Sequence, residues 1–320
     1  MKNEEVTCLF TFSFLIPCFS FSELGLFSAR KKTKSSAFLC KNTPNPLKGE
    51  RMILFPNAKI NLGLRITGRR PDGFHNLESV FYPVGWTDML EILPAKTTSF
   101  RSTGLSIPGA EATNLCLKAY FLLKADHALP PVYLHLHKAV PIGAGLGGGS
   151  ADAAFTLRGL NERFSLGLVD EELEIYARKL GSDCAFFVKN TPRFCFGKGD
   201  EFEEIPFSLA GTWAVLVNPG IHVSTAEAYA GVVPRRPDPD LRTLLRQPRE
   251  TWRDAVRNDF EESLLPRYPA IGEIKRQLYE AGAFYASMTG SGSTVYGFFS
   301  QETDLSPLFS NHSVWQGFLS

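Results

Sequence analysis

The feature that most constrains this chain of 320 residues is a glycine-rich run, VPIGAGLGGGSADAA, at residues 140–154. Five of the seven positions from 143 to 149 are glycine. Glycine loses more conformational freedom on folding than any other residue, so such a run is costly unless the backbone must approach something closely. The alternating segment PVYLHLHKAVP before the run predicts a strand, and the alanine-rich segment after it predicts a helix. Because backbone N–H groups at the start of a helix favour anions, the run predicts a phosphate site.

Other interpretations of this glycine loop are weaker. A tight turn without a ligand needs fewer than five glycines. Gly143, Gly145 and Gly148 satisfy the GxGxxG pattern of dinucleotide-binding folds, but that pattern requires a second strand ending in an acidic residue about 20 positions later. The segment VDEELEIYARKL at 169–180 predicts a helix instead, which disfavours a nicotinamide-dependent dehydrogenase. The Walker and protein-kinase patterns fail because the GK[ST], VAIK and HRD motifs are missing.

The rest of the chain after Met52 predicts an α+β fold with a boundary near residue 205, which separates domains at 52–205 and 206–320. Strand patterns are found at 53–67, 132–136 and 213–220, and two strands joined by a small-residue turn are expected at 284–300. Helical patterns are found at 113–125, 150–164, 170–183, 224–232 and 271–283. Thr113 or Asn114 is expected to cap the first of these helices and Asp170 the third. Residues 234–250 are expected to form a polar, proline-rich connection.

Composition excludes several classes of partner. The formal net charge is +1, which argues against a nucleic-acid-binding surface. The six cysteines form no CxxC pair and have no zinc-ligand spacing, so we expect free thiols in a reducing compartment. We accordingly expect a cytoplasmic protein with no nucleic-acid or membrane partner.

Residues 1–51 differ from the rest because a phenylalanine-rich apolar stretch is followed by the basic segment ARKKTKSSAF. Acidic residues near the start, together with Pro17 and several serines, weaken the signal-peptide, transit-peptide and transmembrane interpretations. We expect translation to start at Met52, which makes residues 1–51 a non-native or disordered extension; a targeting segment is the alternative.

Three motifs together resemble the GHMP kinases. They are FPNAKINLGLRITGRRPDGFHNLESVF at 55–81, PIGAGLGGGSADAA at 141–154 and MTGSGSTVYGFF at 288–299, in the order in which the family has them. The first and third are similar to one branch of the family, which phosphorylates a methylerythritol linked to cytidine diphosphate.

The resemblance implies a two-domain architecture, with an N-terminal ATP-loop domain and a ferredoxin-like C-terminal domain. It also implies an enzyme that uses ATP and Mg²⁺ on this small-molecule substrate as a monomer or weak homodimer. A homoserine- or mevalonate-type kinase and a nucleotide-binding regulator without activity remain as alternatives.

By the same resemblance, Lys59 and Asp183 match the catalytic lysine and aspartate of the family. A carboxylate beside the acceptor hydroxyl can accept its proton as a general base. A nearby ammonium would keep that carboxylate ionised and stabilise developing negative charge. Retention of both residues argues against the inactive regulator.

The remaining site residues also follow from family positions. Those expected to bind the nucleotide are Asn114, Leu115 and Lys138 around adenine, and Pro141, Gly143, Gly145, Leu146, Gly147, Gly148, Gly149 and Ser150 around the phosphates. Those expected to bind the acceptor are Asn61, Phe74, His75, Phe81, Thr225 and Tyr229. Phe74 replaces the tyrosine common at its position, so stacking is kept and a hydroxyl contact is lost. No protein ligand for the metal is predicted.

Overall fold

The computed structural model of the chain describes residues 51–235 and 238–320. The expectations for residues 1–51 therefore lie outside the described residues, apart from Arg51. The described residues all fall within one compact unit, and the boundary near residue 205 stays a prediction.

The strands of the described residues form three four-stranded sheets. In spatial order, the first sheet contains β1 (Met52–Leu54), β4 (Met89–Pro94), β6 (Val132–Lys138) and β5 (Ser99–Gly104). The second sheet contains β2 (Asn57–Arg69), β3 (His75–Thr87), β7 (Arg193–Phe196) and β8 (Glu201–Glu204). The third sheet contains β10 (Tyr285–Met288), β11 (Val295–Phe299), β9 (Trp213–Asn218) and β12 (Ser313–Phe318). Neighbouring strands are antiparallel, except that β5 and β6 are parallel.

The helices fall into two groups along the chain. The first group is η1 (Glu111–Thr113), α1 (Leu115–Asp126), α2 (Gly148–Arg163), α3 (Asp170–Leu180), η2 (Ser182–Ala185) and α4 (Phe186–Lys189). The second group, between β9 and β10, is α5 (Thr225–Ala230), α6 (Leu241–Leu245), η3 (Arg249–Thr251), α7 (Trp252–Ala255), α8 (Glu261–Arg267) and α9 (Pro269–Glu280). A bilayer would require a longer and more apolar helix than any found in the described part of the chain.

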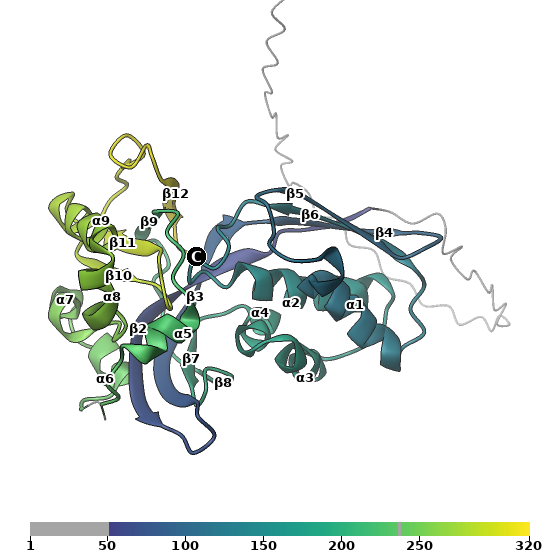
Figure 1. Cartoon of the computed structure of the whole chain (residues 1–320), viewed down its shortest axis with the longest axis horizontal. Coiled ribbons are helices and arrows are strands. Elements are labelled where there is room, and N and C mark those ends of the chain that lie inside the picture. Colours follow the sequence, from purple (N-terminus) through teal and green to yellow (C-terminus); the bar gives the residue numbers. More distant parts are fainter. Residues whose placement is uncertain (1–50, 236–237) are drawn as a thin grey trace, which may run out of the picture. The chain divides into compact units, whose positions relative to one another are not determined.

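Helix α2 packs closely against the first sheet. Figure 1 shows α1 and α2 on one face of β4, β5 and β6. One close approach is at Gly159, where a Cβ atom would lie 2.5 Å from Cδ1 of Leu54 and 2.8 Å from Cδ1 of Ile92. This packing fixes the direction in which the N-terminus of α2, and the glycine loop before it, point.

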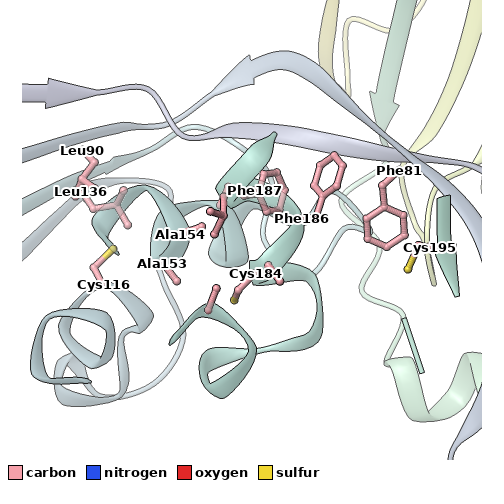
Figure 2. Close-up of a cluster of buried hydrophobic side chains, with 14 of the residues drawn as sticks. Phe81, Leu90, Cys116, Leu136, Ala153, Ala154, Cys184, Phe186, Phe187 and Cys195 are labelled. Carbon is pink, nitrogen blue, oxygen red and sulfur yellow. The ribbon is translucent and has the colours of Figure 1, made fainter. Parts of the chain in front are cut away.

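A cluster of aromatic rings holds α4 against the second sheet. The rings of Phe186 and Phe187 lie 5.0 Å apart, and Phe81 of β3 meets Phe186 at 5.4 Å. Figure 2 shows this cluster. Burying each such side chain contributes about 1.5–3 kcal/mol. The η2 turn, which directly precedes α4 and carries Asp183, is thereby held close to β3.

The third sheet has a ferredoxin-like strand order. Its strands, numbered along the chain, lie in the order two, three, one, four, and all are antiparallel. Helix α9 packs on β10 and β11, which are joined by the loop at 289–294. In the described residues a series of turns, and no second crossover helix, connects β11 to β12.

Most of the predicted elements are present, and two local expectations are wrong. Asn114 caps α1 by accepting a hydrogen bond from the N–H of Cys116 at 2.9 Å. Asp170 is not a cap: it is the first residue of α3, whose cap position is Val169. The connection predicted at 234–250 contains helix α6, because Asp240 accepts a hydrogen bond from the N–H of Thr243 at 2.7 Å and starts a helix whose leucines are buried.

Candidate functional site

The glycine loop leaves no room for side chains at two of its positions. Gly145 has a φ of +78°, and a Cβ atom there would lie 2.0 Å from the carbonyl oxygen of Thr289. A Cβ atom at Gly148, the first residue of α2, would lie 2.8 Å from Nζ of Lys138. The loop is also joined to β2, since the N–H of Lys59 donates to the carbonyl oxygen of Leu146 at 2.9 Å. Close approach to distant segments therefore explains part of the glycine content.

Two cavities adjoin this loop. The first pocket, of about 490 Å³, is lined by residues of the glycine loop and the start of α2, with Asn114, Leu115 and Lys138. The second pocket, of about 500 Å³, contains Lys59 and Asp183. Gly143, Gly145 and Gly147 line both pockets. A ligand in one pocket can therefore approach a ligand in the other along the loop.

Lys59 is held in position by three oxygen atoms. The residue lies on β2 and is almost fully buried. Its Nζ donates to Oδ1 of Asn61 at 2.5 Å and to the carbonyl oxygen of Gly145 at 3.1 Å. It lies 3.5 Å from Oδ2 of Asp183 and 4.6 Å from the centroid of the Phe81 ring. The ammonium therefore points toward the carboxylate.

Asp183 remains accessible from the second pocket. The η2 turn presents it there, and 29% of its side chain is exposed. The nearby hydroxyl of Tyr229 stays neutral, because burial and the Asp183 carboxylate raise its pKa to about 12. A partly exposed carboxylate beside a fixed ammonium is suited to accept a proton from a bound alcohol.

The residues predicted for the acceptor are brought together only in part. Asn61, Phe81, Thr225 and Tyr229 line the second pocket. His75 stacks on Tyr229 with ring centroids 5.0 Å apart and an interplanar angle of 24°.

Phe74 directly precedes His75 in the chain but is exposed. Its side chain is 60% exposed and is not among the residues that line the second pocket. Its ring instead lies 5.4 Å from Nζ of Lys198, which does line that pocket. Stacking of a ligand directly on Phe74 thus has no support in this geometry.

The residues predicted for the nucleotide mostly line the first pocket. Those of the glycine loop and the start of α2 that do so are Pro141, Gly143, Gly145, Gly147, Gly148, Gly149 and Ser150. Leu146 is buried and contributes its carbonyl to the contact with β2. The side chain of Asn114 is used as the cap of α1. Within the described residues, no three His, Cys, Asp or Glu side chains come together as a metal-ion cluster.

Lys138 belongs to a buried ionic cluster with Asp88 and Asp152, two residues that the sequence did not single out. Its Nζ contacts Oδ2 of Asp88 and lies 2.8 Å from Oδ2 of Asp152. Oδ1 of Asp88 accepts hydrogen bonds from the N–H groups of Ala139 (2.6 Å) and Val140 (2.9 Å). The only signal in the sequence was the position of each acid, in WTDML and GSADAA, beside apolar or small residues. The cluster ties the end of β6 to the first turn of α2.

The charge balance of this cluster shifts the pKa values of Asp152 and Lys138. Burial and the neighbouring Asp88, partly offset by Lys138, raise the pKa of Asp152 from 3.8 to about 7. Burial alone would lower the pKa of Lys138, but Asp152 and Asp88 outweigh it and raise that pKa. Oδ1 of Asp152 has no hydrogen-bond partner, and the thiol of Cys116 faces the Asp152 backbone carbonyl at 3.8 Å. Ionised Asp152 is therefore a destabilising element of the folded chain.

In the Asp152→Asn variant, the free energy of unfolding is expected to fall less with rising pH than it does in the wild-type protein. Because the pKa of Asp152 is higher in the folded than in the unfolded chain, the folded state binds more protons between about pH 4 and 7, and the unfolding free energy falls as the pH rises through this window. Urea unfolding at pH 5 and pH 8 measures this fall in the unfolding free energy. The fall should be smaller in the variant than in wild type by on the order of 2 kcal/mol. Asp254→Asn, at an exposed residue, is the control and should keep the wild-type decline. Equal declines in all three proteins would contradict this assignment.

Comparisons of the whole chain with known proteins agree on one family. The family described as "GHMP kinases N terminal domain" matches residues 114–191, and "GHMP kinases C terminal" matches residues 240–310. A 4-diphosphocytidyl-2-C-methyl-D-erythritol kinase of Cytophaga hutchinsonii is 54% identical over 254 residues, which cover 79% of this chain and 94% of the relative. The enzyme of the same name from Bacteroides fragilis is 52% identical over 261 residues, 80% of this chain and 95% of the relative.

Solved structures agree with this relationship. The crystal structure of a 4-(cytidine 5'-diphospho)-2C-methyl-D-erythritol kinase superimposes with a TM-score of 0.72 at 29% identity, over 84% of this chain and 99% of that one. The mevalonate kinase of Methanococcus jannaschii has a TM-score of 0.64 at 15% identity, over 85% and 99% of the two chains, and shares the fold. The expected two-domain GHMP kinase architecture is thereby confirmed. The chain belongs to the GHMP kinase family, in the branch of the 4-diphosphocytidyl-2-C-methyl-D-erythritol kinases.

Proposed function

We propose that this chain uses ATP to phosphorylate the 2-hydroxyl of 4-diphosphocytidyl-2-C-methyl-D-erythritol in the non-mevalonate isoprenoid precursor pathway. The observation that carries the proposal is that Gly143, Gly145 and Gly147 line both pockets. A phosphoryl donor in the first pocket and an alcohol in the second would meet at this loop. The Lys59–Asp183 pair lies on the acceptor side, where the alcohol must lose its proton.

The first pocket has the features that a triphosphate requires. Phosphoryl transfer depends mainly on positioning and on neutralising charge at the transferred group. The N-terminus of α2, a helix of 16 residues, opens into the pocket, and backbone N–H groups there favour anions. Mg²⁺ entering with ATP would neutralise charge on the phosphates, and we place the hydroxyl of Ser150, in the first turn of α2, near it.

We assign different roles at the acceptor to Asp183 and Lys59. We assign Asp183 as the general base that takes the proton of the attacking hydroxyl. Lys59 keeps that carboxylate ionised and stabilises negative charge that develops between the two pockets. The partial exposure of Asp183 and the burial of Lys59 support this division, because the base must reach the ligand whereas the ammonium has to stay fixed.

The cytidine end of the acceptor is assigned to the aromatic surface of the second pocket. Tyr229 lines this pocket, and His75, which is not among the lining residues, stacks on Tyr229. Aromatic faces commonly bind planar bases. Asn61 and Thr225 supply polar groups on the same side. We leave Phe74 out of the direct contacts, since its exposed ring lies over Lys198.

An ADP-release assay with several acceptor alcohols tests the proposal. Turnover is expected with 4-diphosphocytidyl-2-C-methyl-D-erythritol, and less than about 1% of that rate with homoserine or mevalonate, because a site built around polar contacts rejects ligands that leave those groups unpaired. Turnover with homoserine or mevalonate alone would replace the proposal by another GHMP activity. Nucleotide binding without turnover of any acceptor would favour a regulator.

The proposal includes two further expectations about the protein in solution. We place it in the cytoplasm, with a small molecule as its only partner. We expect a monomer or a weak homodimer, which sedimentation at several protein concentrations would measure.

A further inference from the structure

Thr289 is a fully buried residue that contacts the catalytic region from the third sheet. It follows β10 and begins the loop to β11. Its Oγ1 accepts a hydrogen bond from the N–H of Asn61 at 3.0 Å. As a donor, the same hydroxyl lies 3.1 Å from the carbonyl oxygen of Gly145 and 3.3 Å from Oδ1 of Asn61. One hydroxyl thus joins three segments that are far apart in the sequence.

The two oxygen atoms that face this hydroxyl are the ones that orient Lys59. Nζ of Lys59 donates to Oδ1 of Asn61 at 2.5 Å and to the carbonyl oxygen of Gly145 at 3.1 Å. An ammonium has three N–H donors, so these two bonds leave one for the carboxylate of Asp183, 3.5 Å away. The direction of that third donor depends on where the first two acceptors lie.

Each acceptor is fixed by groups other than Lys59. The side-chain Nδ2 of Asn61 donates to Oγ of Ser79 at 3.0 Å, and the backbone carbonyl of Asn61 accepts from the hydroxyl of Tyr296 at 2.8 Å. Gly145 lies directly against Thr289, with no space for a Cβ atom between them. The Thr289 hydroxyl is the group that contacts both acceptors at once.

We infer that Thr289 is a positioning residue for Lys59: its hydroxyl fixes Asn61 and Gly145 and so directs the Lys59 ammonium toward Asp183. The residue acts through these neighbours, since it is fully buried and lines neither pocket. The inference rests on the proposed function for its effect on turnover. Its effect on Lys59 does not depend on which acceptor is used.

The test compares Thr289→Val, which keeps the shape and removes the hydroxyl, with Thr289→Ser, which keeps the hydroxyl. Thr289→Val is expected to lower kcat by about 10- to 100-fold, because small misplacements of catalytic groups have effects of this size. The KM values for ATP and the acceptor should change by less than about threefold, since no substrate contact is lost. Thr289→Ser should keep kcat within about threefold of wild type. Thr212→Val, at another buried threonine outside both pockets, is the control for loss of a hydroxyl and should keep wild-type kcat.

A second measurement follows the ammonium itself. The nitrogen-15 signal of the Lys59 side chain, assigned by its absence in Lys59→Arg, reports hydrogen exchange of the ammonium. Exchange should be about fivefold faster in Thr289→Val than in wild type and unchanged in Thr289→Ser, since losing a hydrogen bond typically costs about 1 kcal/mol, which corresponds to a factor of about five.

The outcomes separate the inference from the proposed function. Wild-type kcat and wild-type exchange in Thr289→Val would overturn the inference, and so would equal losses in Thr289→Val and Thr289→Ser, which would indicate packing alone. If the wild-type protein does not turn over the cytidine-linked acceptor but exchange differs between the variants as expected, the proposed function fails and the positioning role stands.

Discussion

Replacing Asp183 with Asn is expected to lower kcat by about 100-fold or more while the affinity for nucleotide stays within about twofold of wild type. The amide has nearly the shape of the carboxylate but cannot accept the proton of an attacking hydroxyl. Asp183 faces the second pocket, and it is not among the residues that line the first pocket. The loss should therefore fall on the chemical step and leave nucleotide binding intact.

Single-turnover kinetics and calorimetric titration with ADP measure the two quantities separately. Asp254→Asn removes an exposed carboxylate outside both pockets and serves as the matched control. Near-normal kcat in Asp183→Asn would remove Asp183 from the role of base. A parallel loss of ADP affinity would instead indicate that the substitution disturbs the glycine loop.

The glycine loop shows what a sequence can predict from physical reasoning alone. Strand pattern, glycine run and helix pattern follow one another over residues 132–164, and β6, the loop and α2 occur in that order. These signals are local, so they can be interpreted without knowledge of the rest of the fold. The reason for individual glycines was not local: Gly145 meets Thr289, and Gly148 meets Lys138, across contacts that only the tertiary structure creates.

The Lys59–Asp183 pair illustrates the opposite case. Nothing in the spacing of Lys59 and Asp183 indicates that their side chains lie 3.5 Å apart. Resemblance to a family suggested the pair, whereas β2 and the η2 turn bring it together. For Phe74 the predicted ligand contact stays a prediction, because position in a motif does not determine where an exposed loop side chain points.

The buried cluster around Lys138 lay beyond sequence reasoning for a further physical reason. A lysine at the end of a strand has many possible partners, and its burial depends on which helix covers it. The family resemblance implied that Lys138 lies beside adenine, and the residue does line the first pocket. Its ammonium, however, faces Asp88 and Asp152. Stability and nucleotide binding are separate measurements, so the two roles can be distinguished.

Lys138→Met is expected to lower the free energy of unfolding by about 3–5 kcal/mol, the cost typical of removing one partner from a buried ion pair. Methionine fills much of the same volume, so the loss comes chiefly from leaving Asp88 and Asp152 buried without a cation. Urea unfolding at pH 7 measures it, and Lys118→Met, at an exposed position of α1, is the control and should change stability by less than about 0.5 kcal/mol.

A double-mutant cycle with Asp152→Asn isolates the contact itself. If the ammonium mainly compensates the carboxylates, Lys138→Met should be less costly in the Asp152→Asn background, because only Asp88 is then left unpaired. Additive effects would show that Lys138 and Asp152 act independently. Unchanged stability together with a large loss of ADP affinity would mean that the Lys138 ammonium contacts the nucleotide.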